Sequence, residues 1–108
     1  MKVRLKNKSR VTKNALTPGN VYRVIGIECD YFRIMNDFGE PILYNPILFE
    51  VIDCTFNKTW VTHICEDGAR CSYPPMLQRP GFFEDWFAHD RAVMMDLYLY
   101  LVEMARED

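Results

Sequence analysis

Residues 21–53 read VYRVIGIECDYFRIMNDFGEPILYNPILFEVID, a series of short apolar runs. The runs are broken at Cys29-Asp30, at residues 36–40 and at Asn45-Pro46. From Val21 to Ile27, odd-numbered residues would face one side of a strand and even-numbered residues the other. Residues 31–35 are rich in aromatic and β-branched side chains, and Gly39 suits a turn position with positive φ. We therefore predict an antiparallel meander that forms the core of a sheet.

The regions on either side of this meander add further strands. Residues 1–6 alternate apolar and basic side chains, which predicts a half-buried edge strand. Residues 7–14 are polar and basic and predict a loop, either a solvated one or one that contacts nucleic acid. Residues 59–65 and 70–73 predict a hairpin, because Glu66-Asp67-Gly68-Ala69 between them is a turn signal. Pro74-Pro75 ends the second strand, since proline has no N–H to donate.

The C-terminal third predicts helices. Pro80 suits a helix start, and aromatic residues recur at positions 82, 83, 86 and 87. Asp90 can cap a second helix near residues 90–105. Residues 97–102 also fit a strand, but the surrounding Ala, Met, Glu and Arg favour helix. The predicted apolar stripe of this helix consists of Met94, Leu97, Tyr98, Leu101 and Ala105.

The resulting fold class is α+β, with a small curled antiparallel sheet or partly open barrel of five or six strands and a C-terminal helix. A chain of 108 residues is expected to form one domain. Its parts would be a basic N-terminal strand and loop (1–20), a β core (21–73), and an aromatic segment with the C-terminal helix (74–108).

Charge divides the chain into two unequal parts. Residues 1–23 contain seven basic residues and no acidic one, whereas residues 24–108 contain six basic and 15 acidic residues, a net charge of −9. An acidic body repels nucleic acid and attracts a basic protein. The basic N-terminal arm favours a different function, that of a small nucleic-acid-binding module.

The sequence offers little support for catalysis, cofactor binding or membrane insertion. It has no Gly-rich phosphate loop, no G-x-S-x-G elbow and no H-E-x-x-H pair. A zinc site at His63, Cys65 and Cys71 would lack the close cysteine pair that structural zinc sites favour. We expect neither metal nor cofactor, and a small enzyme using His63 or a cysteine is the weaker reading. Free thiols and a cytoplasmic location are expected, because the N-terminus lacks the apolar segment of a signal peptide.

Carboxylates at turn positions are the candidate site. Together with neighbouring aromatic residues they suit protein recognition, since aromatic side chains concentrate in binding hot spots. The alternative is ordinary solvated turns. A rival site is the aromatic group at residues 82–87, which we expect to be mainly core. The candidate partner-binding residues are Glu28, Asp30, Tyr31, Asp37, Phe38, Glu40, Glu66 and Asp67.

A family resemblance covers about residues 16–88. The pattern consists of Leu16, Gly19, Tyr22, Tyr31, Arg33, Asp37, Gly39, Pro41, Leu43, Tyr44, Leu48, Phe49, Val51 and Asp53, followed by Trp60 and PGFFEDWF. This pattern resembles small bacterial immunity proteins encoded beside secreted or contact-delivered toxins. The resemblance implies a small curled barrel of the Src-homology kind and a non-catalytic protein that neutralises a cognate toxin. An acidic body would fit a nuclease toxin, whose groove must be basic. The basic N-terminal arm and the longer C-terminal helix depart from the family pattern.

Overall fold

The computed structural model describes residues 1–7, 15–55, 59–64 and 67–107, and it has the predicted α+β class. In the described residues, seven antiparallel strands, more than the five or six predicted, form a sheet that does not close into a barrel, and a C-terminal helix packs against it. The strands are β1 (Lys2–Leu5), β2 (Val21–Glu28), β3 (Tyr31–Met35), β4 (Pro41–Tyr44), β5 (Phe49–Asp53), β6 (Val61–Ile64) and β7 (Arg70–Tyr73). The helices are η1 (Pro46–Leu48), η2 (Pro75–Leu77), α1 (Phe82–Phe87) and α2 (Arg91–Glu107).

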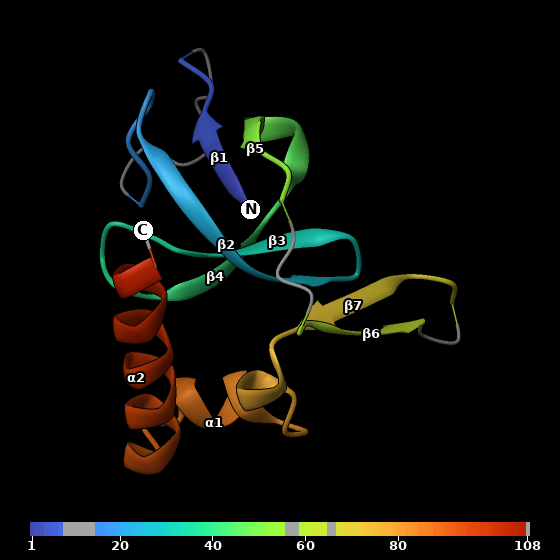
Figure 1. Ribbon diagram of the computed structural model, residues 1–108, viewed down its shortest axis with the longest axis vertical. Coiled ribbons are helices and arrows are strands. Elements are labelled where there is room, and N and C mark those ends of the chain that lie inside the picture. The colour runs from blue at the N-terminus through green and yellow to red at the C-terminus, as the bar shows by residue number, and fades with distance from the viewer. Residues whose placement is uncertain (8–14, 56–58, 65–66, 108) are drawn as a thin grey trace.

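Strand β2 organises the sheet. One of its edges pairs with β3, and its other edge pairs first with β1 and then, at Ile27, with β7. The order β4-β3-β2-β1-β5 therefore makes one run, while the β6–β7 hairpin joins β2 separately. Figure 1 shows this hairpin projecting to the right, with α1 below the sheet and α2 standing at the left of the view.

The predicted edge position of the first strand is wrong. Strand β1 lies between β2 and β5 and pairs with both of them. Val3 and Leu5 are fully buried, while Arg4 is exposed and lies 4.0 Å from Glu50. Alternation shows only that one face of a strand is solvated, and an interior strand of an antiparallel sheet can have such a face. The predicted basic loop at 7–14 falls almost entirely outside the described residues.

The predicted faces of β2 are also partly wrong. A β-bulge between Val24 and Gly26 shifts the register against β3. Ile27 therefore packs in the same apolar cluster as Val24, and Ile25 packs in a different cluster on the other face. A bulge adds one residue to one strand of a pair, which reverses the facing of every residue after it.

The sheet separates two hydrophobic clusters. One contains residues from β1, β2, β3 and β5, together with Leu16. The other lies between the opposite face of the sheet and the helices, and it includes Ile25, Tyr73, Phe83 and Leu97. Both faces of the central strands are therefore covered, which explains why Phe32, Arg33 and Ile34 are all buried.

The C-terminal helix begins where the sequence predicts. Asp90 Oδ1 accepts hydrogen bonds from the backbone N–H groups of Ala92 and Val93, at 3.0 and 3.3 Å. Residues 97–102 are helical, so their ambiguous pattern resolves as helix. The predicted apolar stripe is only partly buried, because Tyr98 is 61% exposed. Among the described residues, no helix is long and apolar enough to cross a membrane.

Candidate functional site

Two turns meet at one end of the sheet. The β2–β3 hairpin has a two-residue loop, Cys29-Asp30, in which both residues have positive φ, 52° and 63°. This is the pattern of a type I′ turn, whose twist matches that of the flanking strands. The Asp30 N–H donates to the Arg70 carbonyl at 3.3 Å, and Asp30 Oδ1 lies 3.7 Å from Arg70 Nε. The β2–β3 turn is therefore held against the start of β7.

Acidic side chains gather where these turns meet. Partial desolvation raises the pKa of the Cys29 thiol, and the nearby Cys71, Glu28, Asp67 and Asp30 raise it further. The carboxylates of two separate hairpins therefore act on one thiol. Tyr31, 45% exposed, follows the same turn. We call Glu28, Asp30, Tyr31 and Asp67 the acidic turn surface.

A buried network supports this surface from beneath. Arg33 is 6% exposed, although it lies in the middle of β3. Its Nε donates to the Tyr73 hydroxyl at 3.0 Å, and Nη2 donates to Glu28 Oε1 at 3.1 Å. Its Nη1 donates to the Pro41 carbonyl at 2.9 Å, and its guanidinium carbon lies 4.0 Å from the centroid of the Phe83 ring. Because each of its three nitrogens donates to a different strand, Arg33 fixes β2, β4 and β7 relative to one another.

Tyr73 completes the network. Its hydroxyl donates to Glu28 Oε1 at 2.9 Å, and its ring lies 5.3 Å from that of Phe83. Burial raises the pKa of Tyr73 far above its ordinary value, with the charge on Arg33 acting in the opposite direction. The neutral hydroxyl therefore remains a donor and holds the Glu28 carboxyl group in place.

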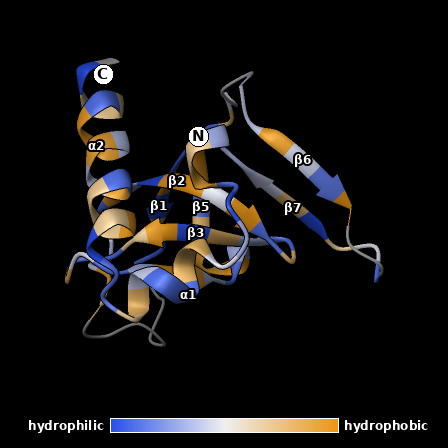
Figure 2. Cartoon of the chain, turned by 90° about the horizontal axis from the view of Figure 1, so that it is seen from below, coloured by the Kyte–Doolittle hydropathy of each residue, from blue (hydrophilic) through white to orange (hydrophobic). Residues whose placement is uncertain are grey.

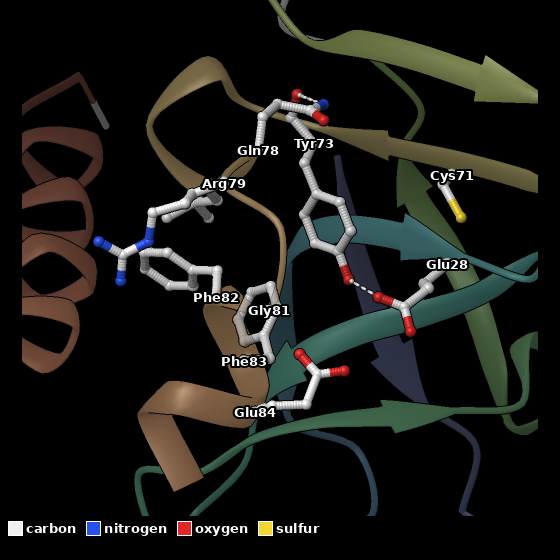
Figure 3. Close-up of a pocket in the computed structure, with 10 residues that line it drawn as sticks. Glu28, Cys71, Tyr73, Gln78, Arg79, Gly81, Phe82, Phe83 and Glu84 are labelled. Atoms are coloured by element: carbon white, nitrogen blue, oxygen red, sulfur yellow. Dashed lines mark hydrogen bonds between the residues drawn. The ribbon is translucent and has the colours of Figure 1, made fainter. Parts of the chain in front are cut away.

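A pocket of about 290 Å³ opens beside this network. Figure 3 shows the Tyr73 hydroxyl pointing to Glu28, with the Phe83 ring packed near the Tyr73 ring and Glu84 coming from α1. Glu28 and Glu84 place carboxyl groups in its lining, and Arg79 lies 3.7 Å from Asp85. Phe83 and Phe82 already have cations of the chain over their rings, with the guanidinium carbons of Arg33 and Arg79 at 4.0 and 5.9 Å from the ring centroids. The groups left for an incoming cationic side chain are therefore the carboxyl groups of Glu28 and Glu84. The lining comprises Glu28, Cys71, Tyr73, Leu77, Gln78, Arg79, Gly81, Phe82, Phe83 and Glu84.

The other predicted site residues lie elsewhere. Asp37, Phe38 and Glu40 belong to the β3–β4 turn, at the opposite end of β3 from Tyr31. A five-residue strand spans roughly 13 Å, so the candidate residues form two groups rather than one surface. Glu66 lies outside the described residues, although its neighbour Asp67 is exposed.

Within the β3–β4 turn, the side chains of Asp37 and Glu40 have internal partners, and Glu40 Oε1 accepts from Asn36 Nδ2 at 3.5 Å. Asp37 accepts hydrogen bonds from Thr17 Oγ1 at 2.7 Å and from the Tyr22 hydroxyl at 2.8 Å. Asn36 Oδ1 accepts from the backbone N–H groups of Phe38 and Glu40, each at 3.0 Å. Phe38 is 65% exposed. The carboxyl group of Asp37 therefore ties the turn to the segment before β2, and Phe38 is the residue of this group that is most available to a partner.

The first three residues of the family pattern also have structural roles. Leu16 is buried, and the Thr17 N–H donates to the Tyr22 hydroxyl at 2.7 Å. Gly19 has φ +85°, and its N–H donates to the Leu5 carbonyl at 2.8 Å. The spacing of Leu16, Gly19 and Tyr22 thus builds the junction that leads into β2.

Arg33, Tyr73 and Glu84 were missed as site residues. Arginine between apolar residues in the run YFRIM is a usable signal, because a charge in a buried strand needs partners. No equivalent signal exists for Tyr73 or Glu84, since their positions depend on how β7 and α1 pack against β2. Comparison with protein families, curated proteins and solved structures gives no match for this chain.

The described residues contain no cluster of His, Cys, Asp and Glu suited to a metal ion. His63 lies directly opposite Cys71 in the β6–β7 ladder, but Cys65, the third residue of the zinc alternative, lies outside the described part of the chain. Cys29 and Cys54 are exposed free thiols. A raised pKa disfavours the thiolate, so the environment of Cys29 is the reverse of what a nucleophilic cysteine requires.

Proposed function

We propose that this protein is a non-catalytic immunity protein that binds and neutralises a cognate bacterial toxin in the cytoplasm. The acidic turn surface is the contact, and the observation that carries the proposal is its construction from two hairpins held together by Asp30 and Arg70. The resemblance of residues 16–88 to immunity proteins supplies the class of partner. The raised pKa of Cys29 is consistent with a role that needs no nucleophile.

A nuclease is the kind of toxin that fits best. Such an enzyme must bind phosphate, so its substrate groove is basic. The net charge of −9 over residues 24–108 provides the complementary field, and complementary charge accelerates association. By binding over the groove, the immunity protein would exclude the nucleic acid from it.

Within the contact, two kinds of group have different roles. Tyr31 is the anchor, because an exposed aromatic ring contributes a large contact area at low entropic cost. The pocket beside the Arg33 and Tyr73 network receives a lysine or arginine side chain of the toxin between Glu28 and Glu84. The Arg33 and Tyr73 network keeps Glu28 in one position, so its carboxyl group is organised before the toxin arrives.

The proposal also includes a more specific description of the fold. The strand order β4-β3-β2-β1-β5 and the apolar cluster shared by β1, β2, β3 and β5 support a partly open barrel of the Src-homology kind. In this proposal the β6–β7 hairpin and the helices are additions to that barrel, and the hairpin contributes Asp67 to the toxin contact.

The test begins with a search for a toxin-domain reading frame beside the gene for this chain. Coexpression with such a domain is then scored by growth and by association kinetics of the purified pair. Asp30→Asn with Asp67→Asn removes two charges. The asparagine at 67 can still accept the hydrogen bond that Asp67 Oδ1 now receives from the Ala69 N–H. We expect weaker protection and an association rate several-fold lower at low salt, with a smaller difference at moderate salt. Tyr31→Ala should accelerate dissociation.

Glu50→Gln is the control for loss of a carboxylate elsewhere, because Glu50 is exposed on β5; it removes one charge, as each of the two single substitutions does. Protection and association by the double variant equal to those of the control would refute the acidic turn surface as the contact. Salt-sensitive binding of the chain to a DNA duplex, without toxin binding, would instead favour the nucleic-acid module based on the N-terminal arm.

A further inference from the structure

Helix α2 has an apolar face that the rest of the described chain leaves uncovered. Val93, Leu97 and Tyr100 pack on the second hydrophobic cluster, but Met95 and Leu99 are 54% and 50% exposed. Figure 2 shows hydrophobic residues repeated along α2, and Figure 1 places the helix at one side of the molecule. A helix that is apolar on opposite faces is normally buried on both.

The exposed face has the spacing of a helix–helix seam. Ala92, Met95, Leu99 and Val102 follow one another at intervals of three, four and three residues. This is the alternation of a and d positions in a heptad repeat, which keeps one stripe facing a partner helix. All of them are exposed or half-buried, so the stripe is accessible along about three turns of α2.

The charges beside the stripe identify the partner. With Ala92 at position a, Arg91 falls at g and Asp96 at e. In a parallel pair of helices, a g residue faces the e residue five positions further along the partner helix. Arg91 of one copy would therefore face Asp96 of the other, and the two-fold symmetry makes this pair twice.

The opposite orientation lacks this match. An antiparallel pair that places Leu99 level with Val102 of the second copy would bring Asp96 near its Glu103, and Arg91 would extend past the second helix. This contact joins like charges, and no contact joins opposite ones. Within the part of the chain that the structure describes, neither Arg91 nor Asp96 has an ion-pair partner that would compete for it.

We propose that this face of α2 is a homodimer interface in which two copies of the chain pair their α2 helices in parallel. Met95, Leu99 and Val102 each meet their own counterparts along the two-fold axis, and Arg91 pairs with Asp96 across it. A helix of 17 residues is about 25 Å long, so the seam is short and the dimer forms only at elevated protein concentration. This interface is separate from the acidic turn surface.

The experiment is sedimentation equilibrium of the full chain from about 1 to 200 µM. We expect the wild-type protein to pass from monomer to dimer in this range. Leu99→Glu should leave the protein monomeric throughout, because two glutamates would face each other in the seam. Ile47→Glu is the matched control, since Ile47 is equally apolar and 72% exposed but lies in η1. Circular dichroism of both variants checks that the helices remain folded.

A charge exchange separates the parallel dimer from other occupants of the face. Arg91→Glu and Asp96→Arg should each raise the dimer dissociation constant several-fold, and the double variant should restore it. A monomer at all concentrations, or a dimer that Leu99→Glu does not affect, would overturn the proposal. A dimer that Leu99→Glu abolishes but that the double charge exchange fails to restore would overturn the parallel arrangement.

Discussion

Gly26 and Tyr73 are in such close contact that a Cβ atom at residue 26 would overlap the Tyr73 ring. The ring cannot swing aside easily, because its hydroxyl is held by Arg33 Nε and Glu28 Oε1. The φ of Gly26 is not positive, so its backbone conformation is open to other residues. Glycine is required here by the neighbour and not by the backbone.

We therefore predict that Gly26→Ala lowers the free energy of unfolding by about 1–3 kcal/mol, as overpacking of a core does. Urea denaturation of the single variants and of the double variant with Tyr73→Ala measures their coupling. The coupling should be at least about 1 kcal/mol, because removal of the ring relieves the overlap. Gly39→Ala is the control: it has φ +75° and no heavy atom within 4 Å of its added Cβ, so it should show no coupling to Tyr73. Additive effects for Gly26 and Tyr73 would contradict this packing.

The buried arginine is the second test. Arg33→Lys keeps the positive charge but cannot serve Tyr73, Pro41 and Glu28 together, since an ammonium group lacks the planar fork. We expect a loss of about 2 kcal/mol, below the range for a fully buried pair because Glu28 is partly exposed. Arg4→Lys changes an exposed pair and should cost less than about 0.5 kcal/mol in the same denaturation experiment. Equal effects of the two substitutions would show that the Arg33 network contributes little.

Features that depend on residues close in sequence could be predicted, whereas features that depend on contacts between distant parts of the chain could not. Strand and helix positions depend on local patterns, so the turns, the Asp90 cap and the α+β class were predictable. The bulge after Val24 was missed, although Gly26 within a strand pattern is a signal for a bulge or for the close approach of a neighbour. The first strand was predicted at the right residues but at the wrong place in the sheet, since one solvated face is common to edge and interior strands.

The candidate site was predictable only in part for the same reason. Glu28 and Asp30 are close in sequence, so one hairpin already unites them. Their approach to Asp67 depends on β7 pairing with β2 at Ile27, and no local signal specifies that pairing. Asp37 resembles Asp30 in sequence context, yet its carboxyl group is engaged with Thr17 and Tyr22. From the sequence alone, a turn carboxylate with a structural role cannot be told from one that is free to contact a partner; the tertiary contacts are needed.

The raised pKa of Tyr73 predicts how stability changes at high pH. Because the folded-state pKa lies above the ordinary value of about 10, the unfolded chain loses this proton first. The stabilisation is therefore fully present below about pH 10 and is lost as the pH rises further, by at most about 1.4 kcal/mol per pH unit for one group. Burial also raises the pKa of Tyr22 and of Tyr44, so these residues add slope of the same sign.

Urea denaturation of Tyr73→Phe between pH 9 and 11.5 checks this. The variant should be less stable at pH 9, because Arg33 and Glu28 lose a partner, but its stability should fall less steeply above about pH 10. Tyr31→Phe, at an exposed position, is the control and should follow the wild-type slope. A slope for Tyr73→Phe that equals that of the wild type would show that Tyr73 does not titrate differently in the folded state.

The last prediction separates carboxylates with a structural role from those of the proposed toxin contact. Asp37→Ala removes the acceptor of the Thr17 hydroxyl and of the part-buried Tyr22 hydroxyl, and we expect it to lower the free energy of unfolding by about 2 kcal/mol. Asp67→Asn should change stability by less than about 0.5 kcal/mol, because the residue is exposed and the amide oxygen can still accept from the Ala69 N–H. Toxin association, measured where both variants are fully folded, should show the reverse order, with Asp67→Asn slower and Asp37→Ala unchanged. Loss of association with Asp37→Ala at full folding would move the contact to the β3–β4 turn, where Phe38 is exposed.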